Sequence, residues 1–203
     1  MSQPSLRMRF GLLAATVHFV ATDFQATYDA VQSVMELSPR YPELYFHFLG
    51  LDLLASAESN LGKHEAALAH RARAEELRAS VGGGFAADWF RAAGAEILLR
   101  AGQVDEALAL SRQAAAQGFY YSAGMAERTI ALALAVKGAP LEQIEGHLLQ
   151  SRALCTAHSQ VVNAAQTEVA WGIILRQRGD EAAAAPHLER GIAMLSAAGC
   201  DYA

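Results

Sequence analysis

The chain has 203 residues and a formal net charge of -5; 53% of its residues are hydrophobic and only 18% are charged. These values exclude a disordered acidic tail, which would be rich in charge and poor in apolar residues. They also exclude nucleic-acid binding by bulk electrostatics, because no basic excess exists to neutralise phosphates. The alanine-rich composition with only five prolines favours a helical protein.

The N-terminal apolar run, residues 11–20, follows two arginines and has the outline of a signal peptide. Thr16 and His18 interrupt it, and Asp23 stands where a small-residue cleavage site should lie, so we interpret it as the first helix of the fold. No stretch approaches the roughly 20 apolar residues of a membrane span. The two cysteines form no evident disulfide framework. We expect a cytoplasmic protein without a membrane partner.

Helix-breaking segments recur along the chain with similar neighbours. Thr22, Gly62, Gly102 and Gly179 stand at equivalent places, and residues 136–142 supply the missing member. A repeat of about 40 residues is typical of helical repeat proteins. The sequence therefore predicts a single domain over residues 1–203 with about five repeats, at approximately 5–41, 42–81, 85–118, 120–158 and 160–198.

Each repeat is predicted to contain two helices. Apolar residues recur at i, i+3, i+4 and i+7 on both sides of each break, which marks one buried stripe per helix. Glycine ends the first helix because it adopts the left-handed conformation cheaply. Small residues follow five positions later at Ala67, Ala107 and Ala184, where two helices must approach closely. The predicted helices are 5–21, 24–37, 42–60, 64–79, 86–100, 104–117, 121–137, 141–157, 160–178 and 181–197.

These residues resemble the tetratricopeptide repeat (TPR), whose pattern is W-x2-L-G-x2-Y, then A-x3-F, then P. The fifth repeat matches through Trp171, Gly172, Gly179, Ala184 and Leu188. The first repeat matches through Phe24, Ala30, Leu37 and Pro39. The resemblance covers residues 5–198 and implies an all-α fold, a right-handed α-solenoid of about five antiparallel helix pairs.

Residues 98–108 and 172–180 also resemble a narrower group. They are similar to the C-terminal repeat region of large bacterial signalling proteins that join a nucleotide cyclase or a LuxR-type regulator to an ATPase module. The sequence contains no G-x4-G-K-[ST] phosphate loop, cyclase domain or helix-turn-helix segment. The cyclase, ATPase and DNA-binding activities therefore do not carry over, and the resemblance concerns the repeats alone.

No group of residues predicts catalysis, a cofactor or a metal site. Residues 82–84 are three glycines without the Lys-Ser/Thr of a phosphate loop, so we interpret them as a turn. Cys155 and His158 lie one helical turn apart, but no second pair completes a zinc site. The histidines show no H-E-x-x-H spacing, and we expect most of them to be partly exposed. Cys200 is expected to be exposed near a fraying end. We predict that the protein is not an enzyme.

A solenoid presents a concave surface, formed in TPR proteins by the first helix of each repeat. Relatives that hold acidic peptide C-termini use a Lys/Arg/Asn clamp there. Asp52, Ser56, Ala92 and Glu96 occupy the corresponding places, so we expect a segment of mixed polarity instead. The resemblance gives these groove positions: Asp52, Ser56, Asn60, Trp89, Glu96, Arg100, Thr129, Lys137, Gln166 and Arg176.

Aromatic residues gather just before or within the first helices of the repeats, as at residues 89–90 and 119–121. Two interpretations remain open, namely packing between repeats and an aromatic-lined ligand surface. The array also shows no capping helix, and its first repeat begins with the apolar residues 10–13. Because exposed apolar patches mark contact surfaces, we predict that one end is covered by another domain, another chain or a self-dimer.

These observations favour a protein–protein interaction or scaffold module of a bacterial cytoplasmic regulatory system, whose groove binds another protein or a peptide segment. Two alternatives stay open. In the first, the groove senses a small molecule or short peptide. In the second, the chain is the repeat remnant of a larger cyclase, ATPase or transcription-regulator chain. No nucleic-acid partner is expected.

Overall fold

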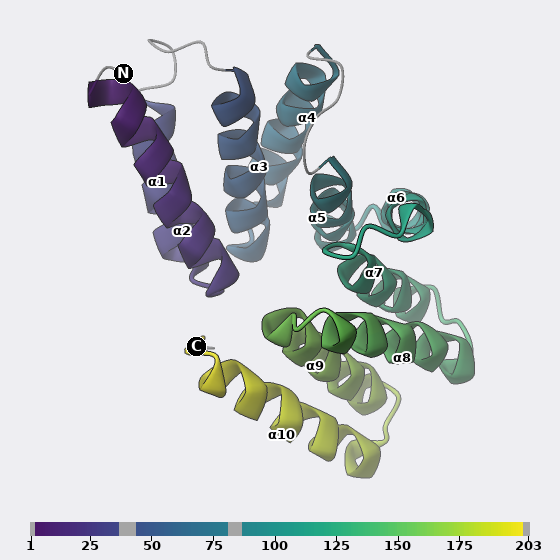
Figure 1. The fold of residues 1–203 in the computed structure, drawn as a ribbon. Coiled ribbons are helices and arrows are strands. Elements are labelled where there is room, and N and C mark those ends of the chain that lie inside the picture. Colours follow the sequence, from purple (N-terminus) through teal and green to yellow (C-terminus); the bar gives the residue numbers. More distant parts are fainter. Residues whose placement is uncertain (1–2, 37–43, 81–86, 201–203) are drawn as a thin grey trace. The chain divides into compact units, whose positions relative to one another are not determined.

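The computed structural model describes residues 3–36, 44–80 and 87–200, and the regular secondary structure in these ranges is α-helical (Figure 1). No described helix end differs by more than two residues from its predicted position, and no helix in these ranges is long and apolar enough to cross a bilayer. The helices are α1 (Gln3–Val20), α2 (Phe24–Met35), α3 (Leu44–Asn60), α4 (His64–Ser80), α5 (Ala87–Arg100), α6 (Val104–Gln117), α7 (Ala123–Val136), α8 (Leu141–Ala157), α9 (Val161–Gln177) and α10 (Glu181–Ala197).

The chain divides into two compact units, an N-terminal unit of residues 1–87 and a C-terminal unit of residues 88–203. In the N-terminal unit each helix packs on the next, and α1 also contacts α3. In the C-terminal unit α6 to α10 pack in chain order and α7 also contacts α9. A cluster of alanines together with Met125 joins α5, α6 and α7. The division between the units falls between the second and third predicted repeats.

The turn between the two helices of each repeat contains one residue with a left-handed backbone. Glycine takes this place at residues 62, 102, 138 and 179, with φ between 74° and 86°. In the first repeat Thr22 takes it with φ of 63°, as its predicted equivalence requires. The following amide closes each turn on the end of the first helix; Asp23 N donates to His18 O at 2.9 Å. This hydrogen bond satisfies a terminal carbonyl.

A fully buried residue follows each of these turns in the second helix. Thr27, Ala67, Ala107 and Ala184 stand five positions after the left-handed residue, and each is 0% exposed. In the fourth repeat the turn is one residue longer, and Ile144 is 0% exposed at the corresponding place. Complete burial at this position in all five repeats is what close packing of the two helices of a repeat requires.

The strained turn of the first repeat yields a test. Left-handed backbone costs a β-branched residue on the order of 1–3 kcal/mol, and the buried Thr22 hydroxyl has no hydrogen-bond partner among the described residues. We expect Thr22→Gly to raise the free energy of unfolding by about 1 kcal/mol in urea denaturation. The reverse change at the equivalent place, Gly62→Thr, should lower it by a similar amount. If both variants shifted the free energy of unfolding in the same direction, the equivalence of Thr22 and Gly62 would be contradicted.

Close helix packing is tested at Gly191 of α10. A Cβ there would lie 2.7 Å from Val169 Cγ2 and 2.9 Å from the Ala165 carbonyl oxygen, so α9 and α10 would have to separate. We expect Gly191→Ala to destabilise the protein by about 2 kcal/mol. Gly146→Ala is the matched control, because no atom lies within 4 Å of its added Cβ in α8. That change should stabilise by about 0.5–1 kcal/mol. Destabilisation by both variants would contradict the packing argument.

Candidate functional site

The first helices of three repeats, α5, α7 and α9, are tied together in the C-terminal unit by one arginine. Arg128 Nη2 of α7 donates to Glu96 Oε1 of α5 at 2.6 Å, and its Nη1 donates to the Asn163 carbonyl oxygen of α9 at 3.1 Å. The Arg128 side chain is only 5% exposed. A planar guanidinium holds several acceptors in fixed directions. Arg128 therefore sets the spacing of these three helices.

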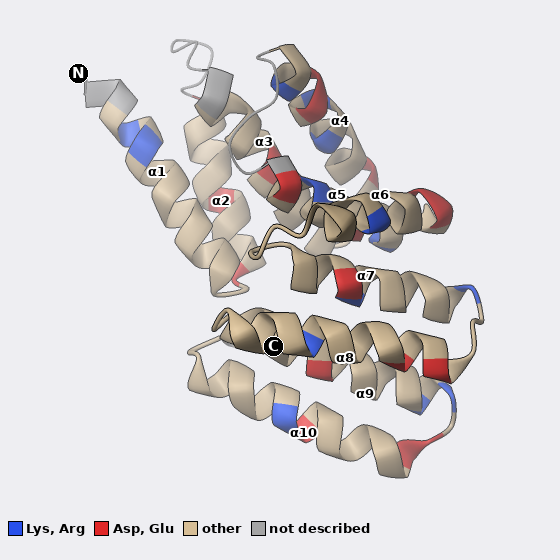
Figure 2. Cartoon of the chain, turned by 45° about the vertical axis from the view of Figure 1, so that its right-hand side comes forward, with Lys and Arg blue, Asp and Glu red and all other residues tan. Residues whose placement is uncertain are grey.

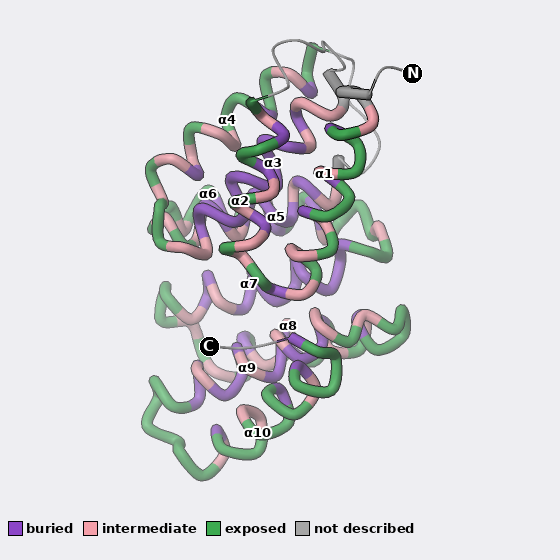
Figure 3. The backbone as a smooth tube through the Cα atoms, turned by 90° about the vertical axis from the view of Figure 1, so that its left-hand side faces the viewer, coloured by how far each residue is buried: buried purple, intermediate pink, exposed green. Residues whose placement is uncertain are grey.

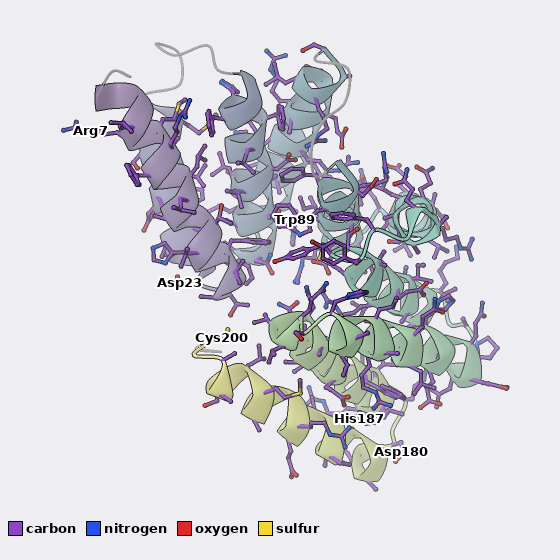
Figure 4. All side chains as sticks on the ribbon, viewed as in Figure 1. Arg7, Asp23, Trp89, Asp180, His187 and Cys200 are labelled. Atoms are coloured by element: carbon purple, nitrogen blue, oxygen red, sulfur yellow. The ribbon has the colours of Figure 1, made fainter. Side chains whose placement is uncertain are left out.

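Aromatic side chains gather where these helices begin, and we call Trp89, Tyr120, Tyr121 and His158 the aromatic edge. Trp89 is half-buried near the start of α5, where it packs against the cluster that contains Met125 of α7 (Figure 4). Tyr120 and Tyr121, just before α7, are 52% and 47% exposed. The Tyr120 and His158 rings lie 5.4 Å apart, which connects the starts of α7 and α9. The rings of the aromatic edge are thus partly exposed and are held in place by contacts with neighbouring side chains.

Basic side chains gather where the same helices end, and we call Arg100, Lys137, Arg176 and Arg178 the basic edge. Figure 2 shows Lys and Arg at the ends of α7 and α9. Lys137 Nζ lies 2.5 Å from Asp105 Oδ1, and Arg178 Nη2 donates to the Ala139 carbonyl oxygen at 2.8 Å. Arg100 and Arg176 are exposed. Cations at helix C-termini are favoured by the helix dipole, which explains their recurrence.

The structure places the predicted groove residues in different environments. Asp52, Ser56 and Asn60 belong to the N-terminal unit, and the other seven belong to the C-terminal unit. Asp52 and Ser56 are each 7% exposed and Thr129 is 0% exposed, so these three lie in the packed interior rather than on a surface. Asn60 is half-buried and donates its side-chain amide to the Ser56 carbonyl oxygen at 2.8 Å. In the C-terminal unit, three predicted groove residues are half-buried, namely Trp89, Glu96 and Gln166. Three others are exposed, namely Arg100, Lys137 and Arg176.

Hydrogen bonds and an ion pair explain why the polar residues Asp52 and Thr129 can be buried. The Asp52 carboxylate pairs with the buried Arg78 guanidinium of α4, which also lies 2.8 Å from Glu75 Oε1. Burial raises the pKa of Asp52 to about 7, although the charge and hydrogen bond of Arg78 oppose the shift. The Thr129 hydroxyl donates to the Met125 carbonyl oxygen of its own helix at 3.0 Å. These polar groups therefore serve packing.

Three histidines of the second helices bind buried carboxylates of the first helices, which the sequence reasoning missed. His70, His147 and His187 occupy equivalent positions, eight residues after the turn glycine or nine in the fourth repeat. Each Nδ1 lies 2.6–2.7 Å from a glutamate Oε2. The glutamates are Glu58, Glu127 and Glu168, with side chains 2–9% exposed. The regular spacing of the histidines after the glycines was the available signal.

Glu168 has the richest surroundings of these carboxylates. His187 lies 2.7 Å from it, and Arg152 and Arg190 each lie 3.2 Å away. Burial raises its pKa, but the hydrogen bonds of His187 and Arg152 and the nearby charges outweigh burial and hold the pKa below its ordinary value. His187 also stacks on Trp171 at 4.4 Å between ring centres (Figure 4). The cluster locks α8, α9 and α10 together.

The two cysteines are buried. Burial raises the pKa of the Cys155 thiol, which disfavours the reactive thiolate. The expected exposure of Cys200 is wrong, because this residue is 4% exposed in a cluster with Ala165 and Leu195. Among the described residues, no three His, Cys, Asp or Glu side chains are grouped so that they could hold a metal ion.

Comparison with known proteins identifies the fold. No family model matches the chain, and no curated protein matches its sequence. A solved structure from Podosopora anserina, described as a kinesin light chain with nearly identical TPR-like repeats, matches with a TM-score of 0.62 and 17% identity, over 99% of this chain and 100% of that one. BtubC (BKLC) from P. vanneervenii matches with a TM-score of 0.59 and 11% identity, over 100% and 95%. The predicted fold class is confirmed. The chain has an all-helical, TPR-like repeat fold.

The Glu168 cluster predicts how stability depends on pH. Because the folded pKa of Glu168 lies below its ordinary value of 4.5, its contribution is fully present above about pH 4.5 and is lost as the pH falls through the folded pKa. We expect Glu168→Gln to cost about 3 kcal/mol at pH 7 and progressively less in acid, measured by urea denaturation between pH 3 and 8.

The exposed pair Arg73–Glu76 of α4 supplies the control for this prediction. Its side chains are 59% and 67% exposed, and such pairs contribute less than about 1 kcal/mol. Glu76→Gln should therefore leave the stability almost unchanged at every pH. A cost of Glu168→Gln that stays constant or grows in acid would contradict the assignment of Glu168 as a stabilising carboxylate.

Proposed function

We propose that this protein is a non-catalytic protein–protein interaction module that binds an extended segment of a partner along α5, α7 and α9, from the starts of these helices to their ends. The observation that carries the proposal is the pairing of an aromatic edge and a basic edge on the same three helices. These helices contain 14 to 17 residues, which corresponds to roughly 21–26 Å. An extended segment of about seven residues spans that length.

The two edges define the chemistry of the partner segment. Partly exposed Trp and Tyr side chains are the residues that most often dominate binding energy at interfaces, so the aromatic edge favours an apolar or aromatic residue. Arginine binds carboxylates through parallel hydrogen bonds, and Arg100 and Arg176 are exposed at the opposite edge. The expected segment therefore has an apolar or aromatic residue at one end and an acidic residue at the other.

The state of the polar groups supports binding over catalysis. Buried carboxylates are engaged by cations or histidines, as Asp52 is by Arg78 and Glu168 is by His187. The Cys155 thiol is buried with a raised pKa. Such groups stabilise the scaffold rather than meet a substrate. The TPR-like solved structures support a scaffold role, because repeat folds present extended surfaces for partners.

The proposal includes a biological setting, which rests on the sequence. Residues 98–108 and 172–180 resemble the repeat regions of bacterial cyclase, ATPase and LuxR-type regulatory proteins, so we propose a role in a bacterial cytoplasmic regulatory system. In that setting, binding of the partner segment would tune the activity of the partner. A single domain of about five repeats over residues 1–203 is part of the same proposal.

A displayed library of random heptapeptides tests the binding face. We expect selected peptides to carry an acidic residue near one end and an aromatic residue near the other. The variant Arg100→Glu/Arg176→Glu should bind the selected peptides at least about tenfold more weakly, which corresponds to about 1.4 kcal/mol. The measurement is fluorescence anisotropy with labelled peptides at fixed ionic strength.

Arg112→Glu is the matched control, because Arg112 is an exposed arginine of α6, a second helix of a repeat. It should leave the affinity within about twofold. Failure to enrich any peptide, or equal losses in the two variants, would contradict the proposed face. Peptides that keep their affinity in Arg100→Glu/Arg176→Glu but lose it in Tyr120→Ala/Tyr121→Ala would indicate recognition by the aromatic edge alone.

A further inference from the structure

Helix α1 has apolar side chains on two opposite faces. Met8, Leu12 and Ala15 point into the N-terminal unit and are 0–2% exposed. These residues pack in the unit where α1 contacts α2 and α3. A helix that is apolar all round is normally covered on every side. The inner face of α1 meets this expectation.

The outer face of α1 is apolar too, but no described part of the chain covers it. Phe10, Leu13, Val17 and Val20 are 50–65% exposed, and we call these four residues the outer stripe. Figure 3 faces α1 and shows exposed stretches recurring along it. Their spacing of three, four and three residues is that of the a and d positions of a coiled coil. The outer stripe therefore has the pattern of a helix–helix seam.

Charges at the two ends of the outer stripe are opposite in sign. Arg7 is exposed at the N-terminal end of α1, and Asp23 is exposed in the turn beyond its C-terminal end (Figure 4). Helix α1 contains no acidic residue. A parallel copy would place arginine beside arginine, whereas an antiparallel copy would place Arg7 near an aspartate. Charge complementarity thus selects the antiparallel orientation.

The stripe is also complementary to itself in position. In an antiparallel pairing about a two-fold axis level with residue 15, Phe10 would face the partner's Val20 and Leu13 would face the partner's Val17. Ala14 is small and exposed beside this axis, which lets two helices approach closely. Two-fold symmetry makes one patch complementary to its own copy, as in the commonest soluble oligomers.

We propose that this chain forms an antiparallel dimer through the outer stripe of α1. The occupant of the stripe is thus a second copy of the chain. The proposal is independent of the partner-binding face, because α1 belongs to the N-terminal unit and that face to the C-terminal unit.

Sedimentation equilibrium over a concentration series tests the dimer. We expect a reversible monomer–dimer equilibrium, and Leu13→Glu/Val17→Glu should raise the dissociation constant at least about tenfold. Both residues are 60% exposed, so the fold should tolerate the change. Leu149→Glu is the control, because Leu149 of α8 is an apolar residue that is 47% exposed. It should leave the dimer unchanged. A protein that stays monomeric up to about 1 mM, or a dimer that the double variant leaves intact, would overturn the proposal.

Cysteine cross-linking tests the orientation separately. In an antiparallel dimer Ala14→Cys places two thiols near the axis, within reach of a disulfide, whereas Arg7→Cys places them about 24 Å apart along the helices. We expect efficient oxidative cross-linking of Ala14→Cys and none of Arg7→Cys. The natural Cys155 and Cys200 are buried and give the background in the unsubstituted protein. Cross-linking of Arg7→Cys with equal efficiency would indicate a parallel dimer and would refute the proposal.

Discussion

The close approach of two helices after each left-handed turn is the constraint on which the rest of this structure depends. Gly62 or its equivalent reverses the chain, and the fully buried residue five positions later, Ala67 in the second repeat, sets how near the helices come. Because interiors are close-packed, the size of that residue fixes the geometry of the pair. In the C-terminal unit, repetition of this geometry brings the starts of α5, α7 and α9 to one edge and their ends to the other.

Buried charge follows from the same packing, and its effect depends on the number of partners. Asp52 and Glu168 are 7% and 1% exposed, yet their pKa values move in opposite directions. Glu168 is surrounded by His187 and two arginines, whereas burial prevails over Arg78 at Asp52. The two carboxylates therefore change the stability of the fold with pH in opposite directions. Protonation of Asp52 favours the folded state as the pH falls from about 7, whereas protonation of Glu168 opposes it at lower pH.

The parts of the fold that the sequence predicts well are those decided by local chemistry. Thr22 could be aligned with the turn glycines because each turn needs a left-handed backbone at one residue only, and the sequence around that residue marks its place. The burial of Asp52 and Thr129 could not be predicted in this way, because α3 and α7 are apolar around most of their circumference and no periodicity tells which face is outward. Cys200 was misjudged for a similar reason, because its burial depends on α9 and α10 together.

The proposed binding surfaces of this protein consist of side chains that are not needed for packing between helices. Between α5, α7 and α9 the polar groups are already engaged, because Arg128 bonds both Glu96 and Asn163. A partner therefore gains little from the middle of these helices, where each new contact would replace an existing one. Residues at helix ends have backbone groups and rings that packing leaves partly exposed, so the aromatic and basic edges can bind without loosening the scaffold. The outer stripe of α1 obeys the same logic, since it can associate while the inner face keeps its contacts.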